Sequence, residues 1–158
     1  MTQRQLEHPS RTVLLDNASD AGLLVLRLAV AAVFIAHGWG DVSQDGGVGA
    51  NVVNYRDAGI PLPEISAPFT AYVQLLGGAV VAFGALTRVI SAGFVVVMAG
   101  ALIFVHRGES LVMGQEGSGS GFAFSMCAAS ITLLLTGAGR FSLDRLYAQR
   151  RTRTAPVT

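Results

Sequence analysis

Four polar side chains interrupt an otherwise apolar sequence, and they are the residues whose types and positions could support chemistry. Arg27, His37, Gln74 and His106 each lie within, or at the edge of, a long hydrophobic stretch. Ionisable groups are costly inside a membrane, so they often mark ligand, ion or proton sites there. The guanidinium of Arg27 can pair with a carboxylate, bind an anion or extend toward lipid phosphates. The amide of Gln74 can join helices or contact a ligand.

The two histidines end different hydrophobic stretches and are expected near the same membrane surface. Two imidazoles at one surface can bind a metal, exchange protons with a quinone headgroup, or do neither. A metal site normally takes three or four ligands. The carboxylates that follow nearby are Asp41, Asp45, Glu109 and Glu116. They lie on irregular segments, and no metal site is predicted.

Cys127 is the only cysteine and lies inside an apolar stretch. Dithiol–disulfide chemistry within one chain needs a reactive pair of cysteines, so that class of reaction is excluded. Cys127 is interpreted as a small packing residue. The sequence contains no glycine-rich phosphate loop, haem-attachment motif or Ser-His-Asp arrangement, and therefore no stand-alone catalytic motif.

The elements that must position these residues are transmembrane helices. Of the 158 residues, 51% are hydrophobic and 13% are charged, about half the charge of an ordinary soluble domain. Four apolar stretches approach the roughly 20 residues that a helix needs to cross the hydrocarbon core. The predicted spans are residues 21–38, 68–86, 89–105 and 121–138.

The arginines predict how the chain lies across the membrane, because positive residues concentrate on the cytoplasmic side. Eight of them precede the first span, follow the fourth, or lie between the second and third: Arg4, Arg11, Arg88, Arg140, Arg145, Arg150, Arg151 and Arg153. The other two linkers contain only Arg56 and Arg107. Both termini are therefore expected in the cytoplasm. The net charge of +1 gives no reason to expect nucleic acid as a partner.

The predicted fold is all-α, an up-down-up-down bundle of four transmembrane helices. Residues 1–20 form a polar cytoplasmic arm, residues 21–138 the membrane domain and residues 139–158 a basic cytoplasmic tail. The long first outer loop contains a short surface helix, and Ser142 begins a short amphipathic helix in the tail. Lipid gives helices no hydrophobic drive to associate, so small residues are expected at their contacts. The predicted packing glycines are Gly77, Gly84, Gly93 and Gly100.

Short motifs follow one another along almost the whole chain. Arg27 precedes Ala36-His37-Gly38 in the first span, and the chain closes on Gly137-Ala138-Gly139-Arg140-Phe141-Ser142-Leu143-Asp144. Between them lie Gly59-Ile60-Pro61-Leu62-Pro63, Leu75-Leu76-Gly77-Gly78 and Phe83-Gly84-Ala85-Leu86-Thr87-Arg88. The order and spacing of these motifs, from about residue 20 to 147, resemble the DoxX family of small integral membrane proteins.

This resemblance implies a role in redox metabolism. The family takes its name from a subunit linked with a terminal quinol oxidase and thiosulfate:quinone chemistry, and related members are described as membrane partners of soluble redox-defence and sulfur-transfer enzymes. The chain is therefore expected to be a bacterial plasma-membrane subunit or anchor of a quinone- or sulfur-linked, oxidative-stress system. The resemblance leaves the cofactor open, with quinone as a candidate, and it implies membrane lipids and a soluble redox or sulfur-transfer enzyme as partners. The alternatives are a small-solute transporter, a lipid-binding protein and a structural membrane assembly factor.

Two positions depart from the family pattern. Family members often have Lys shortly after the His-Gly pair, where this chain has Asp41, and many have Glu early in the second span, where it has Gln74. A neutral amide cannot form an ion pair with Arg27 or relay protons as a carboxylate can, so Arg27 and Gln74 are not predicted to act as a catalytic pair. A homodimer formed through the glycine-bearing faces of spans two and three is a further expectation.

Overall fold

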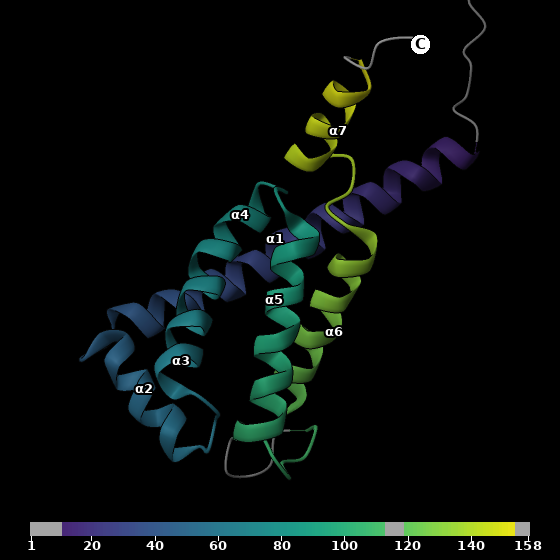
Figure 1. Ribbon diagram of the computed structural model, residues 1–158. Helices are drawn as coiled ribbons and strands as arrows, with labels where there is room; N and C mark the ends of the chain where they lie inside the picture. The colour runs from purple at the N-terminus through teal and green to yellow at the C-terminus, as the bar shows by residue number, and fades with distance from the viewer. Residues whose placement is uncertain (1–10, 113–118, 154–158) are drawn as a thin grey trace, which may run out of the picture.

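The computed structural model describes residues 11–112 and 119–153, and all regular elements within those ranges are helical (Figure 1). Three helices are long and apolar enough to cross a membrane: Asn17–Ser43, Pro63–Ala82 and Thr87–Val105. A fourth apolar helix, α6, covers Gly121–Thr136. Its 16 residues span only about 24 Å at 1.5 Å per residue, somewhat less than the hydrocarbon core. The all-α prediction is confirmed, with three of the four predicted spans meeting the length of a crossing helix.

The first helix is longer than predicted. α1 runs without a break through Arg11–Ser43, so the last part of the expected polar arm is helical and continuous with the first span. The first ten residues of that arm lie outside the described residues. Helix α1 runs obliquely behind α4 and α5 (Figure 1).

The second span is displaced toward the N-terminus relative to the prediction. It consists of α3 (Pro63–Tyr72), a π-helical segment η1 (Val73–Gly77) and α4 (Gly78–Ala82). Proline suits the start of a helix because its fixed φ is helical and its missing N–H needs no partner there. The four residues after Ala82 form the turn into the next helix, so the predicted end of this span at residue 86 is wrong.

The third span combines α5 (Thr87–Gly100) with a second π-helical segment, η2 (Ala101–Val105). The two expected short helices are also present, as α2 (Gly47–Asp57) and α7 (Leu143–Arg153). Ser142 accepts a hydrogen bond at Oγ from the Arg145 amide at 3.2 Å, which is the predicted helix cap. Part of the second predicted outer loop, residues 113–118, lies outside the described residues.

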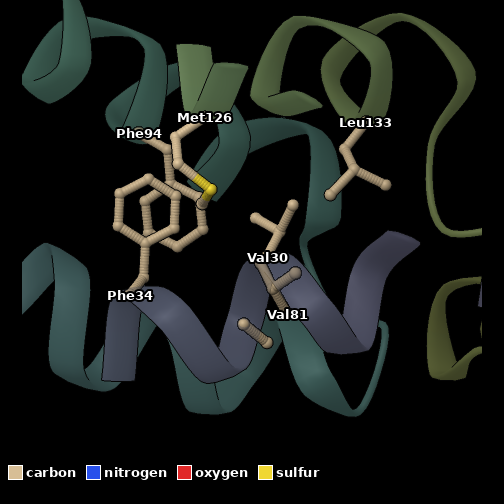
Figure 2. Close-up of a cluster of buried hydrophobic side chains, with 7 residues drawn as sticks. Val30, Phe34, Val81, Phe94, Met126 and Leu133 are labelled. Atoms are coloured by element: carbon tan, nitrogen blue, oxygen red, sulfur yellow. The ribbon is translucent and has the colours of Figure 1, made fainter. Parts of the chain in front are cut away.

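The core forms where α1, α4, α5 and α6 meet (Figure 2). The rings of Phe34 and Phe94 stack with centroids 3.8 Å apart and planes 15° from parallel, and both side chains are at most 1% exposed. Met126 lies beside this pair. The remaining buried members of the cluster are Val30, Ala31, Val81 and Leu133. This core divides the helices into two ends, named here the α2 end and the α7 end.

Large apolar side chains cover the outside of the helices as well as the inside. Phe83, Val89 and Leu135 are each about 70% exposed, and similar residues occur on every long helix. A soluble monomer rarely exposes extended apolar surface, because water disfavours it. The exposed apolar residues on the long helices are therefore consistent with contact with lipid.

The four predicted packing glycines have different environments. A Cβ atom on Gly77 would lie 2.7 Å from the Ile90 side chain, and one on Gly93 would lie 3.1 Å from Val73, so η1 and α5 approach closely at both. Gly84 lies beyond the end of α4, in the turn, so its predicted place inside a helix is wrong. A Cβ on Gly100 would meet no described atom within 4 Å.

Candidate functional site

A cavity of about 420 Å³ lies on the α2 side of the Phe34–Phe94 stack, enclosed by α1, α2, α3–η1, α5–η2 and the start of α6. Its volume falls within the range typical of small-molecule sites. The polar residues that line it are His37, Asp41, Tyr55, Ser66, Thr70, Gln74 and His106. Its apolar lining includes Phe34, Phe69, Phe104, Phe122, Met98 and Met126. The cavity therefore offers a largely apolar space with a few polar groups.

Three of the four polar residues singled out from the sequence meet at this cavity. Gln74 is only 5% exposed and makes no hydrogen bond within the described part of the chain. The ring of His37 lies 5.7 Å from that of Phe122, and the His37 side chain remains accessible. Nδ1 of His106 lies 2.8 Å from Oε2 of Glu109, and this contact orients the imidazole. The Gln74 side chain lines the cavity without a hydrogen-bond partner among the described residues, so its amide is available to a polar ligand.

Both π-helical segments border the cavity. Gln74 belongs to η1, and Ala101, Phe104 and Val105 of η2 line the opposite side. A π-helical turn contains one more residue than an α-helical turn and therefore redirects the side chains that follow it, and such segments occur often at functional sites. The position of Gln74 consequently depends on a local backbone feature that the 3.6-residue pattern of the sequence does not reveal.

The close approach of α1 and η1 brings His37 and Gln74 to the same cavity. Gly38 is buried, and a Cβ on it would collide with the backbone of Leu75. No larger residue fits this contact without moving one of the helices. The glycine beside His37 therefore positions the site.

Tyr55, Asp41 and Thr70 also line the cavity, although the sequence analysis gave them no such role. Burial raises the pKa of Tyr55, a hydrogen bond with Thr70 opposes the rise, and the nearby Asp41 carboxylate adds to it. Tyr55 lies near the end of α2, the short helix predicted in the first outer loop, and its contacts at the cavity depend on how α2 packs against α3.

Arg27 does not take part in this cavity. It lies in the α7 half of the molecule, 2% exposed, and its Nη1 donates to the carbonyl of Ala138 at 2.5 Å. Its Nη2 donates to the carbonyl of Phe141 at 2.7 Å. The guanidinium therefore holds the segment between α6 and α7, and it does not meet Gln74.

The residues of the closing motif make further structural contacts at the α7 end. Asp144 accepts hydrogen bonds from the amides of Leu86 and Thr87 at 2.8 and 3.0 Å, and so caps the start of α5. The amide of Arg140 donates to Asp20 Oδ1 at 3.0 Å. Together with Arg27, these contacts tie α1, α5 and α7 to one point. The motif thus has a structural role at the end opposite the cavity.

Within residues 11–112 and 119–153, no group of three or more His, Cys, Asp or Glu side chains is arranged to hold an ion. Cys127 is partly buried on α6 and carries no disulfide. The side chains that line the cavity can form hydrogen bonds, stack on aromatic rings and, at the imidazoles, exchange protons.

The fold defines an integral membrane protein of several helices, with a largely apolar cavity at the α2 end. The sequence model of the DoxX family matches residues 22–107, and the chain belongs to the DoxX family. It is 30% identical over 152 residues to the "Uncharacterized membrane protein Rv3486" of Mycobacterium tuberculosis (strain ATCC 25618 / H37Rv), covering 91% of this chain and 92% of that protein.

Two other relatives are of similar length. The "Inner membrane protein YqjF" of Escherichia coli (strain K12) is 30% identical over 136 residues, or 83% of this chain and 95% of the relative. The "Putative oxidoreductase CatD" of Bacillus subtilis (strain 168) is 28% identical over 130 residues, or 82% of this chain and 90% of the relative. No solved structure is significantly similar to the chain.

Proposed function

We propose that this protein is the membrane subunit of a quinone-linked redox system and that its cavity binds the quinone head. The observation that supports this most strongly is the cavity, which is lined by Gln74, His37 and His106 together with several aromatic side chains. The name of the Bacillus subtilis relative describes an oxidoreductase, which agrees with this assignment.

The residues present fit a quinone. The Gln74 amide can donate to one quinone carbonyl, and an imidazole can donate to the other. The ring of Phe122 lines the cavity and is more than half exposed, so it can offer a face for stacking. Val96 and Val105 line the cavity and are more than half exposed, so an isoprenoid tail can leave between them into the lipid.

The chain supplies binding and proton exchange, and a soluble redox or sulfur-transfer enzyme supplies the electrons. The His106–Glu109 contact can pass a proton between the cavity and the solvent at the α2 end, because an imidazole and a carboxylate can each bind and release a proton. No residue of the chain needs to change oxidation state.

The membrane arrangement that we propose is an up-down-up-down bundle in which α6 is the fourth crossing. α6 is free of charge and packs along α5. The arginines of the N-terminal arm, the α4–α5 turn and the tail then all lie in the cytoplasm. A fluorescent protein fused to the C-terminus should fold and emit, whereas an alkaline phosphatase fused there should be inactive. The reverse pattern would contradict this orientation.

A homodimer is a further part of this proposal. Ile103 lies one helical turn after Gly100, is 58% exposed and does not line the cavity, so this position on the third span is free to meet a second copy. Cysteine introduced at position 103 should cross-link two chains in native membranes. Absence of a cross-link there, with a cross-link at another exposed position, would contradict it.

Quinone binding can be tested through Trp39, the only tryptophan, which lies two residues after His37 on α1. A short-tailed quinone should quench its fluorescence and reach saturation, whereas an alcohol with the same tail should not. Gln74→Leu should weaken binding about fivefold, since one hydrogen bond contributes roughly 1 kcal/mol. Gln149→Leu makes the same chemical change on α7 and should have no effect. Unsaturable quenching that is equal in all variants would refute quinone binding.

The redox partner can be tested by purifying the tagged protein from native membranes in mild detergent, followed by mass spectrometry. A stoichiometric soluble oxidoreductase or sulfurtransferase is expected. Purification without such a partner, together with solute flux in liposomes, would favour small-solute transport instead. That alternative is favoured by one observation: separate clefts open on the two sides of the core.

A further inference from the structure

A second cleft, of about 950 Å³, lies at the α7 end. It is bounded by α1 near Asp20, by the start of α5, by the segment after α6 and by α7. The cleft shares no lining residue with the cavity described above, so it is separate from the proposed quinone site. Three arginines line it: Arg88, Arg140 and Arg145.

The two carboxylates in this cleft are already bound by groups of the same chain. Both carboxylate oxygens of Asp144 accept hydrogen bonds from backbone amides at the start of α5. Asp20 accepts the Arg140 amide and lies 3.8 Å from the Arg140 Nε. Arg140 is therefore balanced by Asp20, and Asp144 is committed to capping a helix.

Two guanidinium groups remain without a carboxylate partner. Arg88 lies across the turn at Gly137, where a Cβ would be 3.3 Å from its Nε, and its Nη2 donates to the Leu135 carbonyl at 3.2 Å. This one neutral contact leaves most of its donors available. The Arg145 side chain is exposed and has no hydrogen bond or ion pair with any described residue. The cleft is thus complementary to an anion.

One wall of the cleft is apolar and faces the membrane. Leu86 and Val89 line the cleft and are 61% and 68% exposed. They begin the third span, so their exposed faces continue into the lipid-facing surface. A ligand for this site needs an anionic head at the arginines and apolar chains along α5.

We propose that this cleft binds an anionic phospholipid, with its phosphate between Arg88 and Arg145 and an acyl chain along Leu86 and Val89. A guanidinium can donate two parallel hydrogen bonds to a phosphate, which makes arginine well suited to such a head. A free phosphate would satisfy the arginines but would leave the apolar wall unused. The lipid would lie in the leaflet at the α7 end and would brace α7 against the span.

The test compares the binding of phosphatidylglycerol and phosphatidylcholine with matched acyl chains to the purified full-length protein, using native mass spectrometry from detergent. Phosphatidylglycerol should bind more tightly. Each arginine near a lipid surface contributes about 1 kcal/mol, so Arg88→Gln/Arg145→Gln should weaken its binding about 30-fold. Arg56→Gln/Arg107→Gln removes the same charge at the α2 end and should leave binding within about twofold. Unfolding temperatures measured without lipid will verify that the variants are folded.

Arg145→Gln alone should weaken binding about fivefold, and because its side chain is exposed this variant tests the site even if the double variant does not fold. Equal binding of the two lipids would overturn the proposal, as would unchanged binding in the folded variants. Inorganic phosphate that binds as tightly as phosphatidylglycerol would assign the site to a free anion, and this result would also overturn the proposal. None of these outcomes depends on quinone binding at the other cavity.

Discussion

Replacing Arg27 by methionine should destabilise the protein without changing the quinone cavity. The guanidinium donates one hydrogen bond to Ala138 and one to Phe141, and both span more than a hundred residues of sequence. A hydrogen bond from a charged donor contributes about 1.5–3 kcal/mol, and its loss leaves a carbonyl without a partner. Methionine also removes the cost of burying a charge, which offsets part of this loss. The expected net loss is about 3 kcal/mol.

The measurement is the free energy of unfolding in mixed micelles, followed by helical circular dichroism during titration with a denaturing detergent. Arg27→Lys keeps the charge but lacks the planar fork that reaches two carbonyls, so its loss should be intermediate. Arg107→Met is the control, because Arg107 is exposed, and it should change stability by less than about 0.5 kcal/mol.

The same variants distinguish a structural role of Arg27 from a role in ligand binding. Arg27 does not line the cavity of Gln74, so folded Arg27→Met should bind the short-tailed quinone within about twofold of the unaltered protein. A loss of stability below about 1 kcal/mol would refute the reasoning. Loss of quinone binding with unchanged stability would instead place Arg27 at the ligand.

Three further predictions concern other elements. Asp144→Ala removes the acceptor for the amides of Leu86 and Thr87 at the start of α5 and should cost about 1–2 kcal/mol in the same unfolding assay, whereas Asp144→Asn should keep part of this stability. Gly84→Ala places a Cβ 2.6 Å from the Ser142 side chain at a φ of +68°, so it should lower stability by at least about 1 kcal/mol. The raised pKa of Tyr55 means that the unfolded chain loses this proton first as pH rises. The contribution of Tyr55 to the free energy of unfolding should be present below a pH of about 10, the pKa of tyrosine in the unfolded chain, and should be lost as the pH rises above it. Tyr55→Phe should remove this loss when the free energy of unfolding is measured against pH.

Hydropathy alone indicated the long helices. A chain in lipid must form its backbone hydrogen bonds within each segment and must present apolar side chains to the lipid. The position of their ends was less certain. The second span starts at Pro63, because a proline at the first helical position costs a helix little, and Pro68 lies inside it. The span ends at Ala82, just before Gly84 takes a left-handed conformation. The cap at Ser142 was predictable because capping depends on residues close in sequence.

The sequence by itself determined the helical class, the membrane environment and the family, since all three depend on composition, periodicity and ordered motifs. Only the tertiary structure decided which polar residues meet. His37, Gln74 and His106 share a cavity because a glycine contact and two π-helical turns bring their helices together, whereas Arg27 binds backbone carbonyls at the opposite end. Backbone carbonyls are the same in every residue, so no sequence pattern records which of them a distant guanidinium will reach.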